Sequence, residues 1–192
     1  MYAGKVGQSS ARSILYEAKR VALRRLTIED QEEFIALARA SAEFHRPWIE
    51  IPETPAAFSK YLDYFASREA ECVLICSRES GAMAGFITIN YVIGGPYQRA
   101  TVGYGVFAPS ARQGYMSEGF ALLFRFAFVD LGLHRLEADI QPGNSASVSL
   151  AKRVGFRYEG FSPGFICIGG FWKDHERWAV TSDMVMPGGA NA

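Results

Sequence analysis

The sequence predicts an α+β fold built on one mixed, mostly antiparallel sheet of six to seven strands with helices on both faces. Between residues 71 and 107, three strand-like runs follow one another through short glycine-containing turns, which is typical of an antiparallel meander. After residue 107, helix-like and strand-like segments alternate, which indicates crossover connections. A meander that continues into such an alternation gives a mixed sheet, and the helices can cover both of its faces.

The composition is that of an ordinary folded domain. The chain has 192 residues, of which 49% are hydrophobic and 14% aromatic, enough to bury a core. Its 20 Lys and Arg residues balance 20 Asp and Glu residues, so no net field attracts nucleic acid or an anionic membrane. No apolar run is long enough to span a bilayer, and the cysteines and histidines lack metal-ligand spacing. We therefore expect a cytoplasmic protein with no metal, no membrane partner and no direct nucleic-acid partner.

We divide the chain into an N-terminal arm (residues 1–18), a single domain (residues 19–182) and a C-terminal tail (residues 183–192). The arm has weak periodicity and a start that contains Gly and Ser, so we expect it to be loose or to depend on a partner. The tail is rich in small residues. No internal repeat or linker interrupts the central part, which predicts one domain.

The first part of the domain predicts one strand and two helices. Residues 20–26 alternate apolar and basic side chains, as a strand does. Residues 27–30, Thr-Ile-Glu-Asp, resemble a capping box with Asp in place of the usual Glu or Gln, so a helix should follow. Three prolines make residues 43–55 irregular. A second helix is expected over residues 56–67, where apolar side chains recur at helical spacing.

The rest of the chain supplies the meander and the alternation. Residues 119–131 predict a helix that is apolar on most faces, and Gly132 stands where a helix-ending glycine is expected. A shorter helix is expected over residues 144–154. The expected strands cover residues 71–77, 82–91, 100–107, 135–140, 156–165 and 172–181.

The stretch from Ala100 to Leu131 combines a strand, a glycine-containing loop and the start of a long helix. Backbone N–H groups in the loop and the first helical turn have no intrahelical acceptor, and the helix dipole adds positive potential there. Gly114 lets the backbone approach a phosphate closely. The stretch therefore predicts an anion-binding loop, although a plain strand-to-helix turn would also explain it.

A second motif lies about thirty residues further along. It has the form Asn-x-x-Ser-x-x-Leu and ends in Gly-Phe. Asn144 stands at a helix start, where its side chain can cap the helix or reach a ligand rich in amides. Ser147 lies one turn later on the same face. Gly155 and Phe156 mark the helix end and the next strand.

Together the two motifs resemble the GNAT superfamily of acetyl-CoA-dependent N-acetyltransferases, over about residues 20–180. Further segments are similar to the RimJ/RimL branch, which acetylates the N-termini of ribosomal proteins. These segments are residues 45–48, 103–104, 131–138 and 172–175.

The resemblance implies a role for each matched position. The loop amides would bind the pyrophosphate of acetyl-CoA, the strand before the loop and the helix-start asparagine would hold the pantetheine arm, and Ser147 would protonate the departing thiolate. The implied cofactor-binding residues are Val106, Phe107, Arg112, Gln113, Gly114, Tyr115, Met116, Ser117 and Asn144. Tyr104 and Trp48 are candidates for the amine pocket, although Trp48 could instead anchor its loop in the core.

The sequence departs from the family pattern in two places. Ala111 and Arg112 stand where the loop usually begins with Gln or Arg and often a glycine. No catalytic base can be assigned by position, because Thr101 stands where many relatives carry an acidic residue and residues 164–166 contain no carboxylate. Three other carboxylates are better explained as solvated or structural: Glu137, Asp139 and Glu159.

Without a strong base, an α-amine is a better acceptor than a lysine side chain. A lysine has a pKa of about 10.4, whereas a peptide α-amine has one of about 7.7–8.0, so the lysine costs roughly 3 kcal/mol more to deprotonate. Positioning would supply much of the rate, and a strand N–H near Val106 would stabilise the oxyanion. We therefore predict acetyl transfer to a primary amine, with the N-terminus of a ribosomal or other protein as the acceptor, by direct attack in a ternary complex.

Two alternatives remain open from the sequence alone. The protein could bind CoA without turnover and serve regulation, or it could acetylate a small amine such as an antibiotic or a polyamine. An acidic pocket near Trp48 would favour the small amine, whereas an open groove would favour a peptide. The oligomeric state, monomer or homodimer, is also left open.

Overall fold

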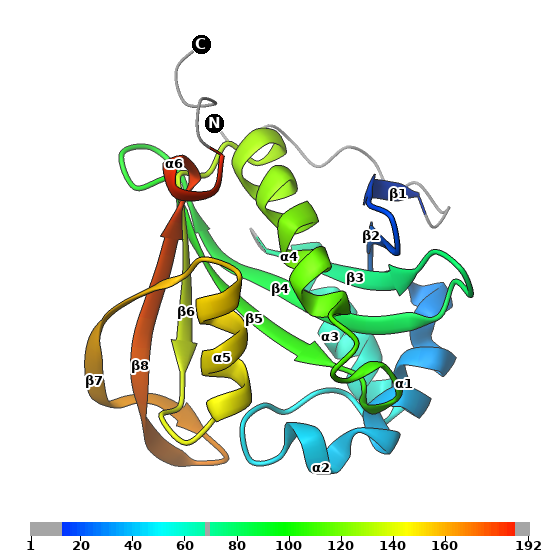
Figure 1. Ribbon diagram of the computed structural model, residues 1–192. Helices are drawn as coiled ribbons and strands as arrows, with labels where there is room; N and C mark the ends of the chain where they lie inside the picture. Colours follow the sequence, from blue (N-terminus) through cyan, green and yellow to red (C-terminus); the bar gives the residue numbers. More distant parts are fainter. Residues whose placement is uncertain (1–12, 68–69, 187–192) are drawn as a thin grey trace.

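The computed structural model describes residues 13–67 and 70–186. These residues form an eight-stranded sheet with the strand order β1-β2-β3-β4-β5-β6-β8-β7 (Figure 1). Every neighbouring pair is antiparallel except β5 and β6, which are parallel. The predicted mixed, mostly antiparallel sheet is confirmed, with one strand more than expected.

The strands are β1 (Ile14–Glu17), β2 (Val21–Arg25), β3 (Glu71–Ser77), β4 (Met83–Ile93), β5 (Arg99–Val106), β6 (Arg135–Ile140), β7 (Arg157–Ile168) and β8 (Phe171–Thr181). The α-helices are α1 (Gln31–Ala40), α2 (Ala42–His45), α3 (Pro55–Ser67), α4 (Tyr115–Arg125), α5 (Ser145–Arg153) and α6 (Ser182–Val185). Three shorter helical segments are η1 (Ile28–Asp30), η2 (Ala108–Ser110) and the π-helical η3 (Phe126–Asp130).

The structure corrects the predicted boundaries at both ends of the domain. Part of the expected N-terminal arm belongs to the sheet, because β1 pairs with β2. The rest of that arm, residues 1–12, lies outside the described residues. Part of the expected tail forms α6, in which Met184 and Val185 pack against the core, while residues 187–192 are not described.

The long helix begins earlier than expected. Gly114 has a φ of 82° and takes the N-cap position, so α4 starts at Tyr115 instead of residue 119. Beyond Arg125 the helix continues as η3, in which Leu131 N–H donates to Phe126 O (3.1 Å). The predicted stop at Gly132 is confirmed by its φ of 63°.

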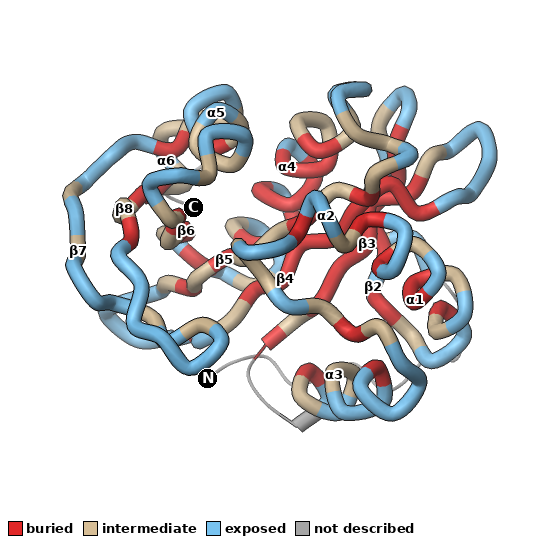
Figure 2. The backbone as a smooth tube through the Cα atoms, turned by 90° about the horizontal axis from the view of Figure 1, so that it is seen from below, coloured by how far each residue is buried: buried red, intermediate tan, exposed pale blue. Residues whose placement is uncertain are grey.

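Helices cover both faces of the central strands, as predicted. On β3 the side chains of Val73 and Ile75 belong to one core cluster together with α4, whereas Leu74 belongs to a second cluster together with α1 and α3. This alternation is the period-2 pattern of a strand that is buried on both faces. Figure 2 shows the buried residues gathered along β2, β3 and β4, whereas β7 is largely exposed.

A buried ion pair fixes the entry into α1. Arg24 donates to both carboxylate oxygens of Asp30, over 2.7 and 2.8 Å. Thr27 N–H also donates to Asp30 Oδ2 (2.9 Å), so Asp30 completes the capping box that the sequence predicted. Asp30 is 0% exposed and Arg24 is 6% exposed, which makes this pair a constraint between β2 and the first helix.

We expect Asp30→Asn to lower the free energy of unfolding by about 3–5 kcal/mol, because it leaves the buried Arg24 guanidinium without its counter-charge. Urea denaturation at pH 7 measures this change. Glu53→Gln is the matched control, since it removes the exposed ion pair with Arg46 and should cost at most about 1 kcal/mol. Equal, small losses in both variants would contradict a structural role for the buried pair.

Candidate active site

The parallel strands β5 and β6 pair over only a short distance. Their ladder joins Arg99, Ala100 and Thr101 to residues 135–137 and then stops. Beyond that point β5 stays paired with β4 and β6 stays paired with β8, so the two strands diverge (Figure 1). The helix α5 lies beside this divergence, between the end of β6 and the start of β7 in the chain.

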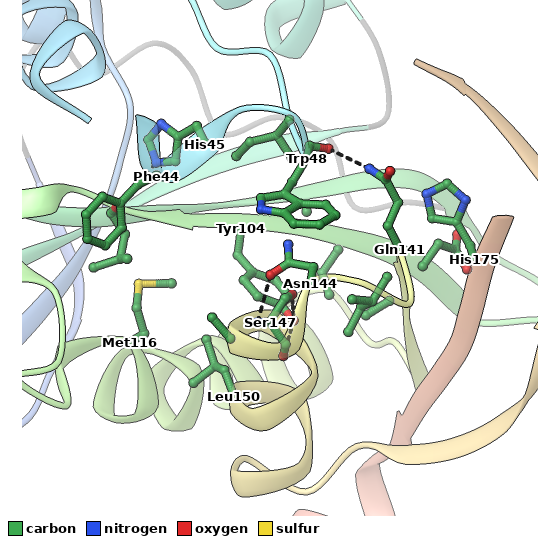
Figure 3. A pocket seen from close by; sticks show the side chains of 18 residues that line it. Phe44, His45, Trp48, Tyr104, Met116, Gln141, Asn144, Ser147, Leu150 and His175 are labelled. Carbon is green, nitrogen blue, oxygen red and sulfur yellow. Dashed lines mark hydrogen bonds between the residues drawn. The ribbon is translucent and has the colours of Figure 1, made fainter. Parts of the chain in front are cut away.

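A cavity of about 190 Å³ occupies the divergence (Figure 3). Its walls come from β5, β6, β8, α5, the N-terminal part of α4 and the loop around α2. Most lining side chains are apolar or neutral. The polar and aromatic residues that matter below are His45, Trp48, Tyr104, Asp139, Asn144, Ser147 and His175.

The backbone of β5 turns polar groups toward this cavity. Phe107, just beyond the end of β5, donates its N–H to Ala84 O on β4 (2.9 Å), so the backbone polar groups at this position point toward β4. Because the hydrogen-bonding direction alternates along an antiparallel strand, the N–H and C=O groups of Val102, Tyr104 and Val106 point the other way. All three residues line the cavity.

The structure separates two residues that the sequence analysis placed together in the pantetheine site. Val106 lies at the cavity, and its carbonyl accepts a hydrogen bond from His45 Nε2 (3.0 Å). Burial lowers the pKa of His45, which favours the neutral imidazole. Phe107 differs: its side chain is fully buried, its N–H donates to Ala84 O and its C=O accepts from Ser110 N (2.9 Å), so its backbone offers no free N–H to a pantetheine arm.

The loop before α4 has the free donors that the sequence predicted. In the described part of the chain, the amides of residues 112–116 have no acceptor. Ser117 N–H is already bonded to Gly114 O (3.0 Å). The run of free amides therefore ends at Met116, one residue before Ser117, which the sequence had placed in the pyrophosphate site. The side chains of Arg112 and Gln113 are exposed and leave the turn open to solvent.

Arg20 supports this loop from the start of β2, which sequence reasoning missed. Its Nη1 donates to Gln113 O (3.1 Å), its Nε donates to Glu118 (2.6 Å), and its guanidinium lies 5.2 Å from the centre of the Tyr115 ring. The contact spans 93 positions of sequence. No local pattern could have indicated it.

The second motif forms a compact hydrogen-bonded group with β5. Asn144 Oδ1 accepts from Ser147 N (3.1 Å), so the carbonyl end of this side chain caps α5. The amide end has no partner among the described residues and lies at the cavity (Figure 3). Ser147 Oγ donates to Tyr104 Oη (2.7 Å), and Tyr104 Oη donates to Ser147 O (3.2 Å).

Tyr104 keeps its proton near neutral pH. Burial raises the pKa of its phenol to about 12, although the hydrogen bond with Ser147 acts in the opposite direction. The phenol is therefore a neutral donor that faces the serine hydroxyl. The sequence listed Tyr104 as a substrate contact, whereas the structure pairs it with the predicted acid.

Trp48 bridges two sides of the cavity and is only partly exposed. Its carbonyl accepts from Gln141 Nε2 (3.3 Å), and its ring lies 3.1 Å from where a Cβ on Gly143 would stand. The residue thus lines the cavity and connects the α2 loop to the loop before α5 (Figure 3). At the cavity, Trp48 therefore lies against Gly143 and Gln141.

The three carboxylates considered in the sequence have different surroundings. Glu137 is buried and accepts from Arg99 (2.7 Å) and Arg135 (2.8 Å), as a structural group does. Glu159 is exposed, and its hydrogen bond with Arg135 lowers its pKa. Asp139 lines the cavity, where burial raises its pKa and the neighbouring Arg177 opposes the rise; the closest approach of the two side chains is 2.6 Å.

His175 on β8 also lines the cavity, and sequence reasoning gave it no role. It is 2% exposed. Its ring lies 6.2 Å from the ring of Phe165 on the neighbouring strand. The sequence predicted a strand over residues 172–181 and nothing more at this position, because hydrophobic patterning contains no information about the divergence of β5 and β6.

No group of three or more His, Cys, Asp or Glu side chains in residues 13–67 and 70–186 is arranged to hold a metal ion. No helix in these same ranges has the length and apolar character needed to cross a membrane.

Comparisons with known proteins place the chain among acetyltransferases. The sequence model of the acetyltransferase (GNAT) domain family matches residues 20–157. The probable N-acetyltransferase YjcK of Bacillus subtilis is 25% identical over 174 residues, which cover 86% of this chain and 96% of that protein. The ribosomal protein uS5 alanine N-acetyltransferase of Escherichia coli is 29% identical over 104 residues, and this match spans 54% of each chain.

The fold is shared with solved structures. Mycobacterium smegmatis RimJ in complex with CoA-disulfide superimposes with a TM-score of 0.78. The match covers 85% of this chain and 82% of that one, at 24% sequence identity. At this identity the likeness establishes the fold alone.

We expect Tyr104→Phe to weaken the loss of stability at high pH. A raised pKa in the folded state contributes stability that is complete below pH 10 and disappears as the pH rises toward 12. A shift of about 2 units corresponds to about 3 kcal/mol at most. Urea titrations at pH 9 and pH 11.5 measure the difference, with the exposed Tyr97→Phe as control; identical pH dependence in both variants would contradict the assignment.

Proposed function

Since the chain belongs to the GNAT acetyltransferase family, we propose that it transfers the acetyl group of acetyl-CoA to the N-terminal α-amine of a protein, by direct attack in a ternary complex. The observation that carries this proposal is the combination of two features, of which the first reaches the cavity at Met116 and the second lines it. A run of free amides lies at the start of α4, and a neutral hydroxyl pair lies where β5 has left β6.

The described residues fit two parts of acetyl-CoA, its charged pyrophosphate and its polar pantetheine arm. Free amides in residues 112–116 at a helix start suit a pyrophosphate, because they donate hydrogen bonds to it and the helix dipole favours its charge. The unpaired edge of β5 suits the amides of a pantetheine arm, and the free amide end of Asn144 can donate to the same arm. When bound, acetyl-CoA supplies an activated acyl group as its thioester.

The chain's own groups can stabilise the charges that develop during transfer. The N–H groups of Tyr104 and Val106 face the cavity and can donate to an oxyanion. Ser147 Oγ lies 2.7 Å from Tyr104 Oη, so either hydroxyl can restore a proton that the other gives to the thiolate. This retains the role predicted for Ser147 and adds Tyr104 as its proton partner.

The cavity favours a singly charged α-amine over a polyamine. A polycation needs several carboxylates, whereas Asp139 is the single carboxylate among the described residues that line this cavity, and Arg177 neutralises it. The relative that acetylates an alanine of ribosomal protein uS5 acts on this same class of amine. An α-amine also has a lower pKa than a lysine side chain, so less base strength is required.

Thiol release from acetyl-CoA, measured with a panel of peptides, tests the proposal. The panel should contain free N-terminal Ala, Ser and Met peptides, the same peptides with blocked N-termini and internal lysine, and spermidine. We expect release only with free α-amines, and a gain of one acetyl group at residue 1 of the peptide by mass spectrometry. Binding of CoA without release for any amine would contradict the proposal and favour a regulatory CoA-binding protein.

We expect Gly114→Asp to lower the affinity for acetyl-CoA by about 100-fold or more, because it places a negative charge beside the pyrophosphate and forces a side chain onto a left-handed backbone. Calorimetry measures the affinity. Gly132→Asp is the matched control: it has the same left-handed strain at the opposite end of the helix, with open space around its Cβ position. Equal affinities in the two variants would remove the loop from the site.

We expect Ser147→Ala to lower kcat by about 10- to 100-fold while leaving the affinity for acetyl-CoA nearly unchanged. Because Ser147 and Tyr104 act as a pair, the double variant with Tyr104→Phe should lose no more activity than the worse single variant. Ser149→Ala, on an exposed position of the same helix, is the control. Fully additive losses would contradict a shared proton path.

A further inference from the structure

We infer that His175 is the general base of the proposed acetyl transfer, with Nε2 as the atom that receives the proton of the incoming amine. This inference rests on the proposed function and supplies the base that sequence comparison could not assign. It uses a side chain from β8, across the cavity from the Tyr104 and Ser147 pair on β5 and α5.

The position of His175 is the first argument. Figure 3 shows its imidazole beyond Gln141, on the β8 side of the cavity, while Tyr104 and Ser147 lie together on another side. A base and an acid on separate walls can serve the attacking nitrogen and the leaving sulfur at the same time. The residue is 2% exposed, so the cavity is its principal opening.

The tautomer of His175 is the second argument. Nδ1 lies 3.0 Å from the backbone carbonyl of Lys173, and a carbonyl oxygen can only accept, so Nδ1 carries the proton in the neutral ring. Nε2 then holds the lone pair. No described residue donates to Nε2, which leaves it available to a substrate nitrogen or to a water between them.

The neighbouring charges are the third argument. Asp139 on β6 interacts favourably with the protonated imidazole, since His175 lowers the pKa of Asp139. On β8 itself, the sequence neighbours are Asp174, whose carboxylate accepts from Gly164 N (2.7 Å), and Glu176, whose carboxylate accepts from the Trp178 indole. The Lys173 ammonium lies 5.5 Å from the centre of the Phe171 ring, and β7 presents the neutral ring of Phe165 to the histidine. The Arg177 guanidinium lies over that same Phe165 ring and against Asp139.

The other carboxylates near the cavity are poorer bases. Arg177 lies against Asp139, with a closest approach of 2.6 Å, and its guanidinium opposes protonation of that carboxylate. Glu137 is held by arginines on both sides. Glu159 is exposed on β7 and is absent from the cavity wall. His45 also lines the cavity, but its Nε2 donates to Val106 O and its unpartnered Nδ1 is buried. Of the lining groups compared, His175 is therefore the one whose Nε2 lone pair is available at the cavity.

The proton balance of the step is complete. The amine nitrogen forms a bond to the thioester carbon, and the carbon–sulfur bond breaks. The proton that the nitrogen loses goes to Nε2 of His175, directly or through one water. The sulfur takes its proton from the hydroxyl pair of Ser147 and Tyr104. The imidazolium and the hydroxyl pair then exchange protons with solvent, which restores the starting state.

His175→Asn tests this assignment, because an asparagine amide can still donate to the Lys173 carbonyl while it offers no basic nitrogen. For an α-amine peptide, log kcat/KM in the wild type should rise with a slope of about two at low pH, one proton from the amine and one from the base. In the variant the slope should fall to about one, and kcat should fall about 100-fold. His134→Asn, on an exposed position, is the matched control and should keep both slope and rate.

A second variant guards against a folding defect. His175→Ala opens space beside β8, and added imidazole should restore part of its activity without affecting the wild type. A slope of two in the asparagine variant, or an alanine variant that imidazole does not rescue although it binds acetyl-CoA normally, would overturn the assignment. If the wild type releases no thiol with any amine, the proposed function fails and this inference fails with it.

Discussion

The site depends on the point at which the ladder between β5 and β6 ends. Beyond Thr101 one edge of the β5 backbone pairs with no strand of the described residues, and buried N–H and C=O groups without partners are costly. His45 satisfies one of these groups, the carbonyl of Val106. The remaining groups can be satisfied by a ligand that extends along the strand, as the amides of a pantetheine arm would. The same divergence leaves room for α5 to bring Ser147 to Tyr104.

The anion-binding loop is held in place by close packing of the helix that follows it. A Cβ on Gly119 would lie 2.2 Å from Ile75 Cδ1, so only glycine allows α4 to lie this near to β3. Three residues earlier in the same helix, Met116 packs against β4: its Sδ atom would lie 2.6 Å from a Cβ on Gly85. From the opposite side, Arg20 bonds the loop carbonyl of Gln113. The free amides therefore project from a rigid support and need little reorganisation on binding.

Charge around the cavity is largely neutralised by ion pairs, which leaves neutral hydrogen-bonding groups at its walls. Glu137 and Asp139 on β6 face three arginines: Arg99 on β5, Arg135 on β6 itself and Arg177 on β8. Such pairs prevent uncompensated buried charge on the strands that form the cavity. In the proposed reaction, proton transfer then falls to neutral groups, the two hydroxyls on one side and the imidazole on the other. A neutral imidazole base suits an α-amine, whose pKa lies near 7.7–8.0.

Local sequence determined much of this protein: the strand and helix order, the capping box at Asp30, the stop at Gly132, and the free amides beside Gly114, because each follows from periodicity or from the conformation of a few adjacent residues. Tertiary structure alone decided which distant side chains meet. Arg20 contacts the loop across 93 positions of sequence, and the Phe107 side chain is part of the core. His175 lines the cavity because β8 pairs with β6, which diverges from β5. These outcomes depend on how strands diverge and pack, and hydrophobic patterning along one chain contains no record of that geometry.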